Sequence, residues 1–414
     1  MKIAFVSQPW NQCPPVKGGS ISIWITEVAR RLSKACDVVV YANSSKLQKK
    51  KELEGGVYYR RISTSFENRF LRYLKRFSQF YTVKRPLFAS RAYYLGYIIK
   101  VARDIRKQKC DIVHVHNFSQ FIPVIRAYNP GVKIILHMHC DWLVELDRSM
   151  IKQRLDLADL IVGCSEYITE KIRRHFPEYA HRCQTIYNGV DIEHFAPEKD
   201  SGKKNNDAKH LLFVGRITPE KGLHTLLEAF QILVTQCPQV RMEIVGPHDQ
   251  TPRSFIVDLH NNNKVANLKW FYDKNYLSQL KAMLCSDTAS KVTFSGHIQQ
   301  AYLHNNYRNA DVLVNPSFSE SFGMSLVEAM ATEVPVVATR VGGMTEVIEE
   351  DKTGILVEPG DAPALAAAIL RLLANEEVRK SMGSAARKRA VELFSWDRIS
   401  EKLLCQYKNI DKHA

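Results

Sequence analysis

Short runs of β-branched and aliphatic residues alternate with longer stretches of helical periodicity, and this alternation constrains the fold of the chain most. Strands that alternate with helices are typical of a parallel sheet with helices on both faces. We therefore predict an α/β fold built from doubly wound parallel sheets. In the first half of the chain, the predicted strands are residues 2–7, 37–42, 111–115, 133–138 and 159–163. In the second half, they are residues 210–215, 241–246, 292–295, 311–315, 334–339 and 354–357.

The length of 414 residues exceeds what one compact core normally holds, and each set of strands is sufficient for one Rossmann-like sheet. We predict an N-terminal domain of residues 1–190 and a C-terminal domain of residues 210–395. Residues 191–209 are polar and rich in turn-forming residues, so they are the predicted linker and hinge. Residues 248–291 are long for a connection in an α/β fold. They predict an insertion that is partly helical around residues 276–285.

The composition is that of a globular protein, with 45% hydrophobic and 24% charged residues. The first apolar run, residues 3–6, is too short for the core of a signal peptide or for a membrane-spanning helix. The nine cysteines are odd in number and include no C-x-x-C pair, which favours a reduced protein over a disulfide-bonded one. We therefore expect a cytoplasmic location.

Positive charge is concentrated in residues 46–109, which hold eighteen Lys and Arg against four Asp and Glu, or +14 of the net charge of +15. Such a surface attracts polyanions: an anionic leaflet, a phosphorylated acceptor or nucleic acid. A solvated basic face without a partner is the alternative. No stacking-aromatic or recognition-helix motif accompanies the charge, so a nucleic-acid partner is disfavoured.

Aromatic residues are interleaved with this positive charge at helical spacing, and they are Phe66, Phe70, Tyr73, Phe77 and Phe80. This pattern predicts peripheral contact with the anionic inner face of a membrane. A stripe that faces the protein core has the same spacing, and the sequence leaves that interpretation open.

The strongest chemical motif lies in residues 317–331, where a predicted strand is followed by a loop and a helix. Glu320 lies in the loop and Glu328 inside the helix, which we expect to begin near Phe322 with Ser319 or Ser321 as its N-cap. One carboxylate could reach a sugar while the other reaches a ribose. A capped helix with a surface glutamate is the alternative.

The first turn of this predicted helix would bind a diphosphate. Its free amides belong to Phe322, Gly323 and Met324. Backbone amides and the helix dipole favour an anion at such a position, and glycine lets the backbone approach it closely.

Two further segments could bind phosphate. Arg216 and Lys221 follow the predicted strand at residues 210–215, where they could neutralise a diphosphate. Gly18 and Gly19 follow the first predicted strand and could bring amides against a phosphate or a sugar hydroxyl. The glycines do not form G-x-G-x-x-G, which disfavours an NAD site. A solvated loop and an ordinary turn are the respective alternatives.

Two His-x-His pairs end neighbouring predicted strands: His114 with His116, and His137 with His139. Alternation along a strand places the members of each pair on one face. We predict no metal site, because no third ligand has a motif-like spacing. Hydrogen bonding to a sugar is the better functional interpretation at the strand ends, whereas His114 and His137 are expected to be core histidines with satisfied hydrogen bonds.

The ordered set of motifs resembles the retaining glycosyltransferases of the GT-B fold, group 1 (family 4), over nearly the whole chain. The motifs are Gly18–Gly19, His139, N-G-V-D at residues 188–191, F-V-G-R and K-G within residues 213–222, E-x7-E from Glu320 to Glu328, and V-G-G-x-x-E at residues 341–346. The resemblance implies two Rossmann-like domains that face a cleft, with a terminal helix of residues 396–414 that packs back on the first domain.

The resemblance also implies roles for these residues. Arg216 and Lys221 would grip the donor diphosphate and stabilise the departing nucleotide, Glu328 would bind the ribose, and Glu320 would lie beside the transferred sugar. His139 would lie near the reacting carbon. The base would be held, largely through backbone, by residues 295–298, which include His297 and Ile298.

The implied reaction is the retaining transfer of a hexose-type sugar from a UDP-sugar or GDP-sugar to a hydroxyl of a glycan, lipid-linked or small-molecule acceptor. No metal or other cofactor is expected. A nucleotide-sugar 2-epimerase of the same fold, a nucleic-acid-binding protein and a non-catalytic donor-binding module are the alternatives. The chain departs from the family pattern in the insertion at residues 248–291 and at Glu333, where glycine is commoner.

Overall fold

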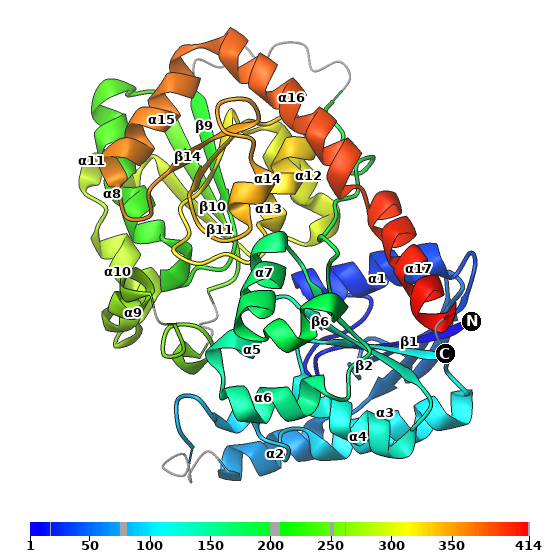
Figure 1. Ribbon diagram of the computed structural model, residues 1–414. Coiled ribbons are helices and arrows are strands. Elements are labelled where there is room, and N and C mark those ends of the chain that lie inside the picture. The colour runs from blue at the N-terminus through cyan, green and yellow to red at the C-terminus, as the bar shows by residue number, and fades with distance from the viewer. Residues whose placement is uncertain (17, 75–80, 199–207, 249–251, 261, 413–414) are drawn as a thin grey trace. The chain divides into compact units, whose positions relative to one another are not determined.

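The computed structural model describes residues 1–16, 18–74, 81–198, 208–248, 252–260 and 262–412. The chain forms two compact units (Figure 1). Unit 1 consists of Met1–Asn188 and Trp396–Ala414, and unit 2 consists of Gly189–Ser395.

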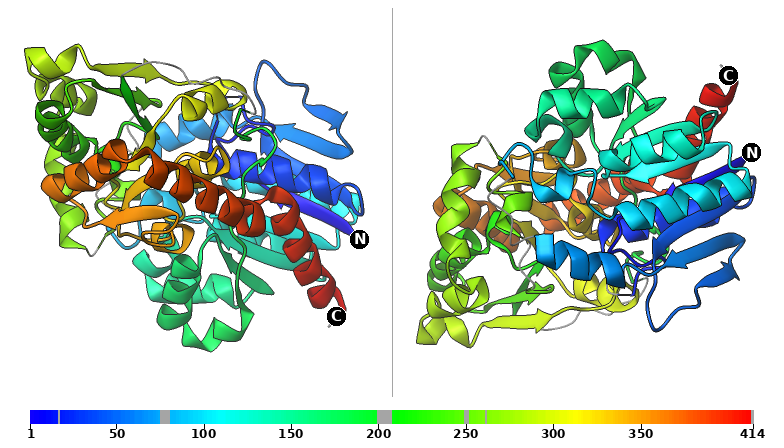
Figure 2. Two further views of the ribbon diagram at one scale, coloured as in Figure 1. Left: turned by 90° about the horizontal axis from the view of Figure 1, so that it is seen from above. Right: turned by 90° about the horizontal axis from the view of Figure 1, so that it is seen from below.

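Unit 1 contains an eight-stranded sheet in the order β3-β4-β2-β1-β5-β6-β7-β8. The strands are β1 (Lys2–Val6), β2 (Asp37–Asn43), β3 (Lys51–Glu54), β4 (Val57–Ile62), β5 (Ile112–His116), β6 (Lys133–Met138), β7 (Leu160–Gly163) and β8 (Cys183–Thr185). All neighbours pair in parallel except β3 and β4, an antiparallel hairpin at the edge of the sheet (Figure 2). The five predicted strands are present. The sequence analysis missed β3, β4 and β8, because two are interrupted by charged residues and the third has three residues.

Helices cover both faces of this sheet. In Figure 1, α1 (Ser20–Leu32) and α17 (Trp396–Lys412) lie together on one face, and α3 (Leu95–Gln108) and α4 (Ile122–Tyr128) lie on the other. The remaining helices are α2 (Ser65–Leu74), α5 (Trp142–Glu145), α6 (Arg148–Leu155) and α7 (Glu166–His175), with short 3-10 turns at Leu87–Ala89, Ser119–Phe121 and Pro177–Arg182.

The terminal helix α17 is part of unit 1. Its Tyr407 hydroxyl is hydrogen-bonded to Nδ1 of His114, at 2.6 Å, in the middle of the sheet. Near its first turn, the Asp397 carboxylate accepts a hydrogen bond of 2.8 Å from Nε of Arg31 on α1. The terminal segment therefore completes the core of the unit that begins the chain.

Unit 2 contains a six-stranded parallel sheet in the order β11-β10-β9-β12-β13-β14. The strands are β9 (Lys209–Val214), β10 (Val240–Val245), β11 (Val292–Gly296), β12 (Val312–Asn315), β13 (Val336–Thr339) and β14 (Gly354–Val357). All six were predicted. Because β12, β13 and β14 are buried along their whole length, they read as apolar runs without alternation. The two parallel-sheet units confirm the predicted fold class.

The helices of unit 2 pack on both faces of its sheet. They are α8 (Leu223–Gln236), α12 (Gln300–Arg308), α13 (Met324–Ala331), α14 (Met344–Val347), α15 (Ala362–Ala374) and α16 (Glu376–Phe394), with a 3-10 turn at Pro219–Lys221. The core between α8, α15 and the sheet includes Leu226, Leu233 and Ile369, all fully buried. Truncation of one such leucine to alanine costs about 2–5 kcal/mol.

The described part of the segment predicted as linker and hinge, together with Val190 before it, packs on unit 2. Val190 donates a backbone hydrogen bond of 2.7 Å to Phe394, and Phe195 is buried against Tyr307. Nε of Arg308 donates to the carbonyl of Ala196, at 2.8 Å. Residues 199–207 of the predicted hinge lie outside the described residues.

The insertion at residues 248–291 is built of short helices. These are α9 (Asn263–Ala266), α10 (Tyr276–Ala282) and α11 (Ser286–Ala289), with 3-10 turns at Arg253–Phe255 and Asn267–Tyr272. The predicted helix at residues 276–285 therefore ends three residues early, at Ala282. Val257, Val265 and Leu268 form a small apolar cluster of their own, with Phe318 of the main body packed against it. Residues 249–251 and 261 of the insertion lie outside the described residues.

Glu333 adopts a left-handed conformation with φ 61°. This explains why glycine is commoner at this position of the family pattern, since only glycine adopts that conformation without strain. Among the described residues, no helix has the length and apolarity that crossing a bilayer requires.

Candidate functional site

The candidate site of unit 2 lies where the direction of strand order reverses. Strand β9 is the first of the sheet, and the chain then proceeds outward through β10 and β11 on one side and through β12, β13 and β14 on the other. In open α/β sheets, ligands bind at such a switch point, beyond the carboxyl ends of the strands. The loop with Arg216 and Lys221 follows β9, and the loop with Glu320 follows the adjacent strand β12.

These two loops are in close contact. Gly222 has φ +71°, and a Cβ atom at this position would lie 2.0 Å from the carbonyl oxygen of Pro316. The backbone amide of Phe318 donates a hydrogen bond of 2.8 Å to the carbonyl of Glu220. Only glycine permits this approach, so the K-G pair of the motif has a structural cause.

Lys221 and Glu320, 99 residues apart in the chain, form an ion pair in which Nζ donates to Oε2 at 2.6 Å. The other carboxylate oxygen accepts hydrogen bonds from the amides of Ser321, at 3.1 Å, and Phe322, at 3.4 Å. Burial opposes ionisation of Glu320, but the charge and hydrogen bond of Lys221 outweigh it, so the pKa lies below its usual value. The structure thus brings together the predicted cation and the predicted carboxylate.

The predicted start of the helix was wrong by two residues. Helix α13 begins at Met324, and its N-cap is Gly323 with φ 103° and no side-chain cap. Ser319 does not cap it, since its hydroxyl contacts Nε2 of His260 at 3.3 Å. Neither Ser321 nor Glu320 caps the helix, and the Glu320 carboxylate binds two amides of the loop before it. The amide of Gly323 lies at the N-cap and that of Met324 in the first turn, where a helix offers no backbone acceptor.

Glu328 is buried, with 4% of its surface exposed, so the alternative of a surface glutamate is wrong. The hydroxyl of Tyr307 donates to Oε2 at 2.6 Å, and the side-chain amide of Gln300 donates to Oε1 at 2.7 Å. Burial raises the pKa of Glu328, and the two hydrogen bonds oppose this rise. The sequence analysis did not identify Gln300 and Tyr307, whose only signal is a seven-residue spacing on α12.

Arg216 lies near the Lys221–Glu320 pair and remains partly exposed, with 42% of its side chain accessible. Its Nη2 lies 3.4 Å from Oε1 of Glu220, a buried carboxylate that the sequence analysis did not single out. Two cations, Arg216 and Lys221, therefore lie with the N-terminus of α13 and with the carboxylates of Glu220 and Glu320 at one edge of the sheet. Such a set can bind a diphosphate and stabilise charge that develops on it.

His297 and Ile298 follow β11, at the same edge of the sheet but on its outermost strand. His297 is exposed and Ile298 is half-buried. The turn that leads to them begins at Gly296, with φ 69°. No contact joins them to Arg216, Lys221 or Glu320 among the hydrogen bonds of the described residues, so their role in holding the base stays a prediction.

Gly18 and Gly19 belong to unit 1. Both have positive φ, 75° and 114°, and Gly19 directly precedes α1 without a side-chain cap. The chain therefore turns sharply just before α1 and presents the first turn of a thirteen-residue helix. This geometry requires glycine and fits the expected anion-binding role, which stays a prediction.

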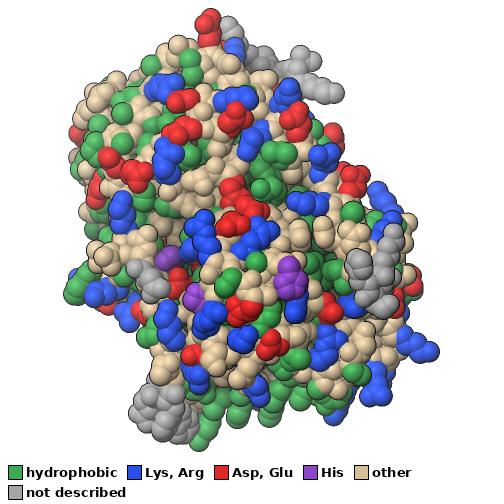
Figure 3. Space-filling model, in the orientation of Figure 1, with side chains coloured by type: hydrophobic (Ala, Val, Ile, Leu, Met, Phe, Trp, Pro, Cys, Tyr) green, Lys and Arg blue, Asp and Glu red, His purple; other side chains and the backbone are tan. Residues whose placement is uncertain are grey.

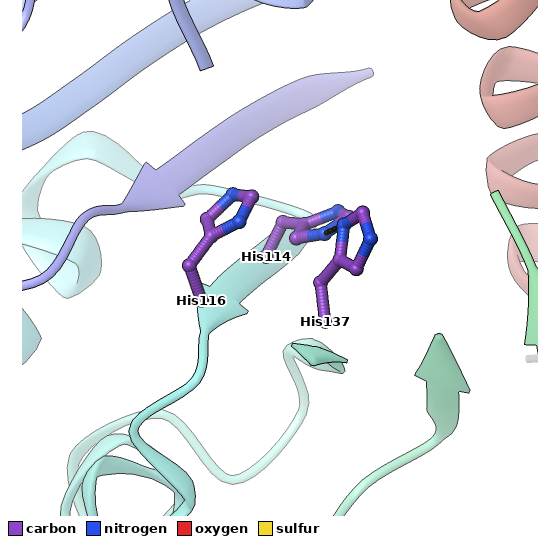
Figure 4. A group of neighbouring side chains, drawn as sticks. All are labelled: His114, His116 and His137. Carbon is purple, nitrogen blue, oxygen red and sulfur yellow. Dashed lines mark hydrogen bonds between the residues drawn. The ribbon is translucent and has the colours of Figure 1, made fainter. Parts of the chain in front are cut away.

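The two His-x-His pairs form one stacked group on β5, β6 and the residue after β6. Figure 4 shows three of the four, His114, His116 and His137. Nδ1 of His137 is hydrogen-bonded to Nε2 of His114 at 3.1 Å, and Nδ1 of His116 to Nε2 of His139 at 3.0 Å. The ring of Trp24 packs against all four imidazoles. Burial lowers the pKa of each histidine, and that of His139 to about 3, so the group is neutral at pH 7.

Three of these histidines nevertheless lie close enough together to resemble a set of metal ligands. Two come from β5 and the third from β6, so spacing along the sequence did not reveal the set. One nitrogen each of His114, His116 and His137 lies within 4.8 Å of the others. The His114 and His116 rings are stacked at 20°, with centroids 4.8 Å apart. Lone pairs lie in the ring planes, so stacked rings direct them side by side rather than toward one ion. This geometry favours a packed core group over a metal centre.

His139 lies at the end of β6, where it was expected, but its ring is turned inward. Nε2 bonds to His116, and Nδ1 is shielded from solvent. Its backbone amide donates to Oδ1 of Asn117 at 2.7 Å. A hydrogen bond from this ring to a sugar would therefore require either that Nδ1 become accessible or that the contact of Nε2 with His116 break.

A second candidate surface is helix α2, the aromatic and basic segment. Only Glu67 and Leu71 of this helix are buried. Phe66, Phe70 and Tyr73 are exposed to 78%, 45% and 54%, so the core-facing interpretation is wrong for these three residues. Figure 3 shows hydrophobic side chains along the lower edge of the molecule, where Figure 1 draws α2. Phe77 and Phe80 lie outside the described residues.

Comparison with known families explains the arrangement of both units. The family model described as glycosyltransferase family 4 matches residues 21–194, and the one described as glycosyl transferases group 1 matches residues 195–389. Together they span most of the chain.

Individual proteins agree with these matches. Spore coat protein SA of Bacillus subtilis is 27% identical, with 99% of each chain covered. The lipopolysaccharide 1,2-N-acetylglucosaminetransferase of Salmonella typhimurium is 26% identical, with 99% of this chain and 98% of the relative covered. Among solved structures, HepE of Anabaena in complex with UDP has a TM-score of 0.71 at 19% identity, with 99% of this chain and 100% of that chain covered. The family matches, the relatives and the two parallel-sheet units together place this chain among the group 1 glycosyltransferases of the GT-B fold.

Proposed function

We propose that this glycosyltransferase moves a hexose-type sugar from a UDP-sugar to a hydroxyl of a lipid-linked glycan, with retention of configuration at the anomeric carbon. One observation carries the donor site: Arg216, Lys221 and Glu320 lie together beyond the ends of β9 and β12, at the switch point of unit 2. Positive charge and helix amides at such a point suit a diphosphate.

The charge that needs stabilisation is that of the departing diphosphate. Arg216 and Lys221 supply two cations, and the first turn of α13 supplies amides. Glu320 holds Lys221 in place and stays ionised, since its pKa is lowered. No side chain of this set need form a covalent intermediate, because the acceptor proton can pass to the leaving phosphate.

Glu328 is the proposed ribose-binding acid. Tyr307 and Gln300 fix its two oxygens, each of which keeps a lone pair for a ribose hydroxyl. A buried carboxylate that is held in advance loses little freedom when it binds, which favours affinity.

The choice of UDP rests on HepE, a fold neighbour solved with that nucleotide. The lipid-linked acceptor rests on the lipopolysaccharide transferase among the relatives and on the surface of α2. Exposed Phe66, Phe70 and Tyr73 lie beside exposed Arg69 and Arg72. Aromatic rings that enter the headgroup region and cations that attract anionic lipid suit the inner face of a membrane.

Release of nucleotide from a panel of UDP-, GDP- and ADP-sugars tests the donor proposal. We expect UDP release from one UDP-sugar, measured by mass spectrometry. Lys221→Ala should lower turnover by on the order of 10²-fold, because one preorganised stabilising charge is lost. Lys388→Ala, which removes an exposed lysine of α16, is the matched control. Near-normal turnover in Lys221→Ala would remove Lys221 from the site. An epimer formed from donor alone would instead indicate the epimerase alternative.

The Lys221–Glu320 pair predicts a pH dependence of stability. A lowered pKa in the folded state stabilises the fold above the usual value of 4.5, and this contribution is lost as the pH falls through the lowered pKa. The difference in unfolding free energy between wild type and Glu320→Gln, from urea titrations, should therefore shrink below pH 4.5.

Glu328→Gln provides the control of opposite sign. The raised pKa of Glu328 makes the ionised carboxyl unfavourable, so the stability of wild type relative to this variant should fall as the pH rises above 4.5. Parallel pH profiles for the two variants would contradict the assigned environments.

Co-sedimentation with vesicles tests the membrane contact. Wild type should bind vesicles that contain phosphatidylglycerol, bind phosphatidylcholine vesicles weakly, and dissociate as salt is added. Phe66→Ala combined with Phe70→Ala should weaken binding by on the order of 10²-fold or more, since burial of each aromatic ring contributes roughly 1.5–3 kcal/mol and about 1.4 kcal/mol corresponds to tenfold. Tyr302→Ala, at an exposed aromatic of unit 2, should bind as wild type does. Equal binding to both kinds of vesicle, or to neither, would refute the proposal.

A further inference from the structure

The insertion at residues 248–291 reaches the proposed diphosphate site through a buried carboxylate. Glu220 lies between Arg216 and Lys221 in sequence and has 1% of its surface exposed. Thr218 donates to its Oε1 at 2.7 Å, and the hydroxyl of Tyr272 donates to its Oε2 at 3.0 Å. We propose that Tyr272 is a positioning residue that holds Glu220, and through it Arg216, in the orientation that binds the donor diphosphate. This inference rests on the donor site proposed above.

Glu220 has the contacts that this role requires. A buried carboxylate without donors is costly, so Thr218 and Tyr272 fix where its oxygens lie. Nη2 of Arg216 is 3.4 Å from the same oxygen that Thr218 binds. A guanidinium has five N–H donors, so the contact of Nη2 with Glu220 does not by itself exclude hydrogen bonds to phosphate oxygens. An arginine held by a carboxylate in this way loses less rotamer freedom when it binds its ligand.

The insertion holds Tyr272 firmly. Tyr272 and its neighbour Phe271 pack on the small apolar cluster of Val257, Val265 and Leu268. Burial, and then the negative charge of Glu220, raise the pKa of Tyr272, so its hydroxyl keeps the proton that it donates.

The same insertion also contacts the loop that follows β12 and carries Glu320. The ring of His224 is stacked between Phe271 of the insertion, with centroids 4.4 Å apart, and Phe318 of the loop, 5.3 Å apart. Nε2 of His260 lies 3.3 Å from the Ser319 hydroxyl. The insertion therefore braces the loops that carry Arg216 and Glu320, and a shift in its position would reach both.

The contribution of Tyr272 should appear in phosphate recognition rather than in base recognition. In Tyr272→Phe, the dissociation constant for UDP should rise on the order of tenfold, since a hydrogen bond to a buried charge is lost. The dissociation constant for uridine, which has no phosphate, should stay unchanged. Titration calorimetry measures the first and saturation-transfer NMR the second.

Tyr276→Phe is the matched control for loss of a buried hydroxyl. It lies in the same insertion, and its hydroxyl is hydrogen-bonded to Nδ1 of His224 at 2.8 Å rather than to Glu220. Any loss of stability in this variant should leave the ratio of UDP to uridine affinity as in wild type. The same change of ratio in both variants would show a general structural effect and overturn the positioning role.

A double-mutant cycle with Arg216→Ala separates positioning from stability. If Tyr272 acts through Arg216, Tyr272→Phe should cause no further loss of UDP affinity once Arg216 is absent. Additive losses would overturn the inference while the donor site stands. Failure of wild type to bind UDP at all would contradict the proposed donor, and this inference with it.

Discussion

The ion pair between Lys221 and Glu320 depends on the register of two adjacent strands. Strand β9 pairs with β12 through Leu211 with Val312 and Leu212 with Leu313, so both strands end at the same edge. Gly222 then lets the two loops touch. Charged groups taken partly out of water are stable only when such geometry pairs them, which is why a cation and a carboxylate 99 residues apart meet here. The donor site proposed above exists only while this edge is intact.

The core of unit 1 contains a cluster of neutral polar groups instead of an ion pair. Four imidazoles and Trp24 fill the space between β5, β6 and α1, and the terminal helix completes the group through Tyr407. Charged histidines could not share this volume, because each would pay the cost of desolvation beside its neighbours. The packing of imidazole nitrogens against one another, rather than against carboxylates, keeps them neutral and links the two ends of the chain.

The segments that depart from the family pattern differ in their consequences. Glu333 keeps the left-handed turn that glycine would make without strain, and it therefore changes little. The insertion is different, since Tyr272 contacts the loop that follows β9, His260 contacts the loop that follows β12, and Phe271 stacks on His224 of α8. The segment that departs from the family pattern therefore packs directly against the proposed donor site.

The sequence determined the fold class and most of the strands, because buried parallel strands are recorded locally as short apolar runs. It also singled out Arg216, Lys221, Glu320 and Glu328 as candidate site residues, since loops after strands and helix starts have local signals, and their roles stay predictions. It missed the β3–β4 hairpin and placed the start of α13 two residues early, because the N-cap is Gly323 in a left-handed conformation rather than a serine.

Only the tertiary structure decided which groups meet. Strand order and the packing of segments far apart in sequence determine the contacts of Glu220, Tyr272, Tyr307 and Gln300. The inward turn of His139 and the outward face of α2 were likewise decided by neighbours rather than by spacing. Periodicity in the sequence predicts that a helix or strand has an apolar face. Whether that face is buried depends on which other segments of the chain pack against it.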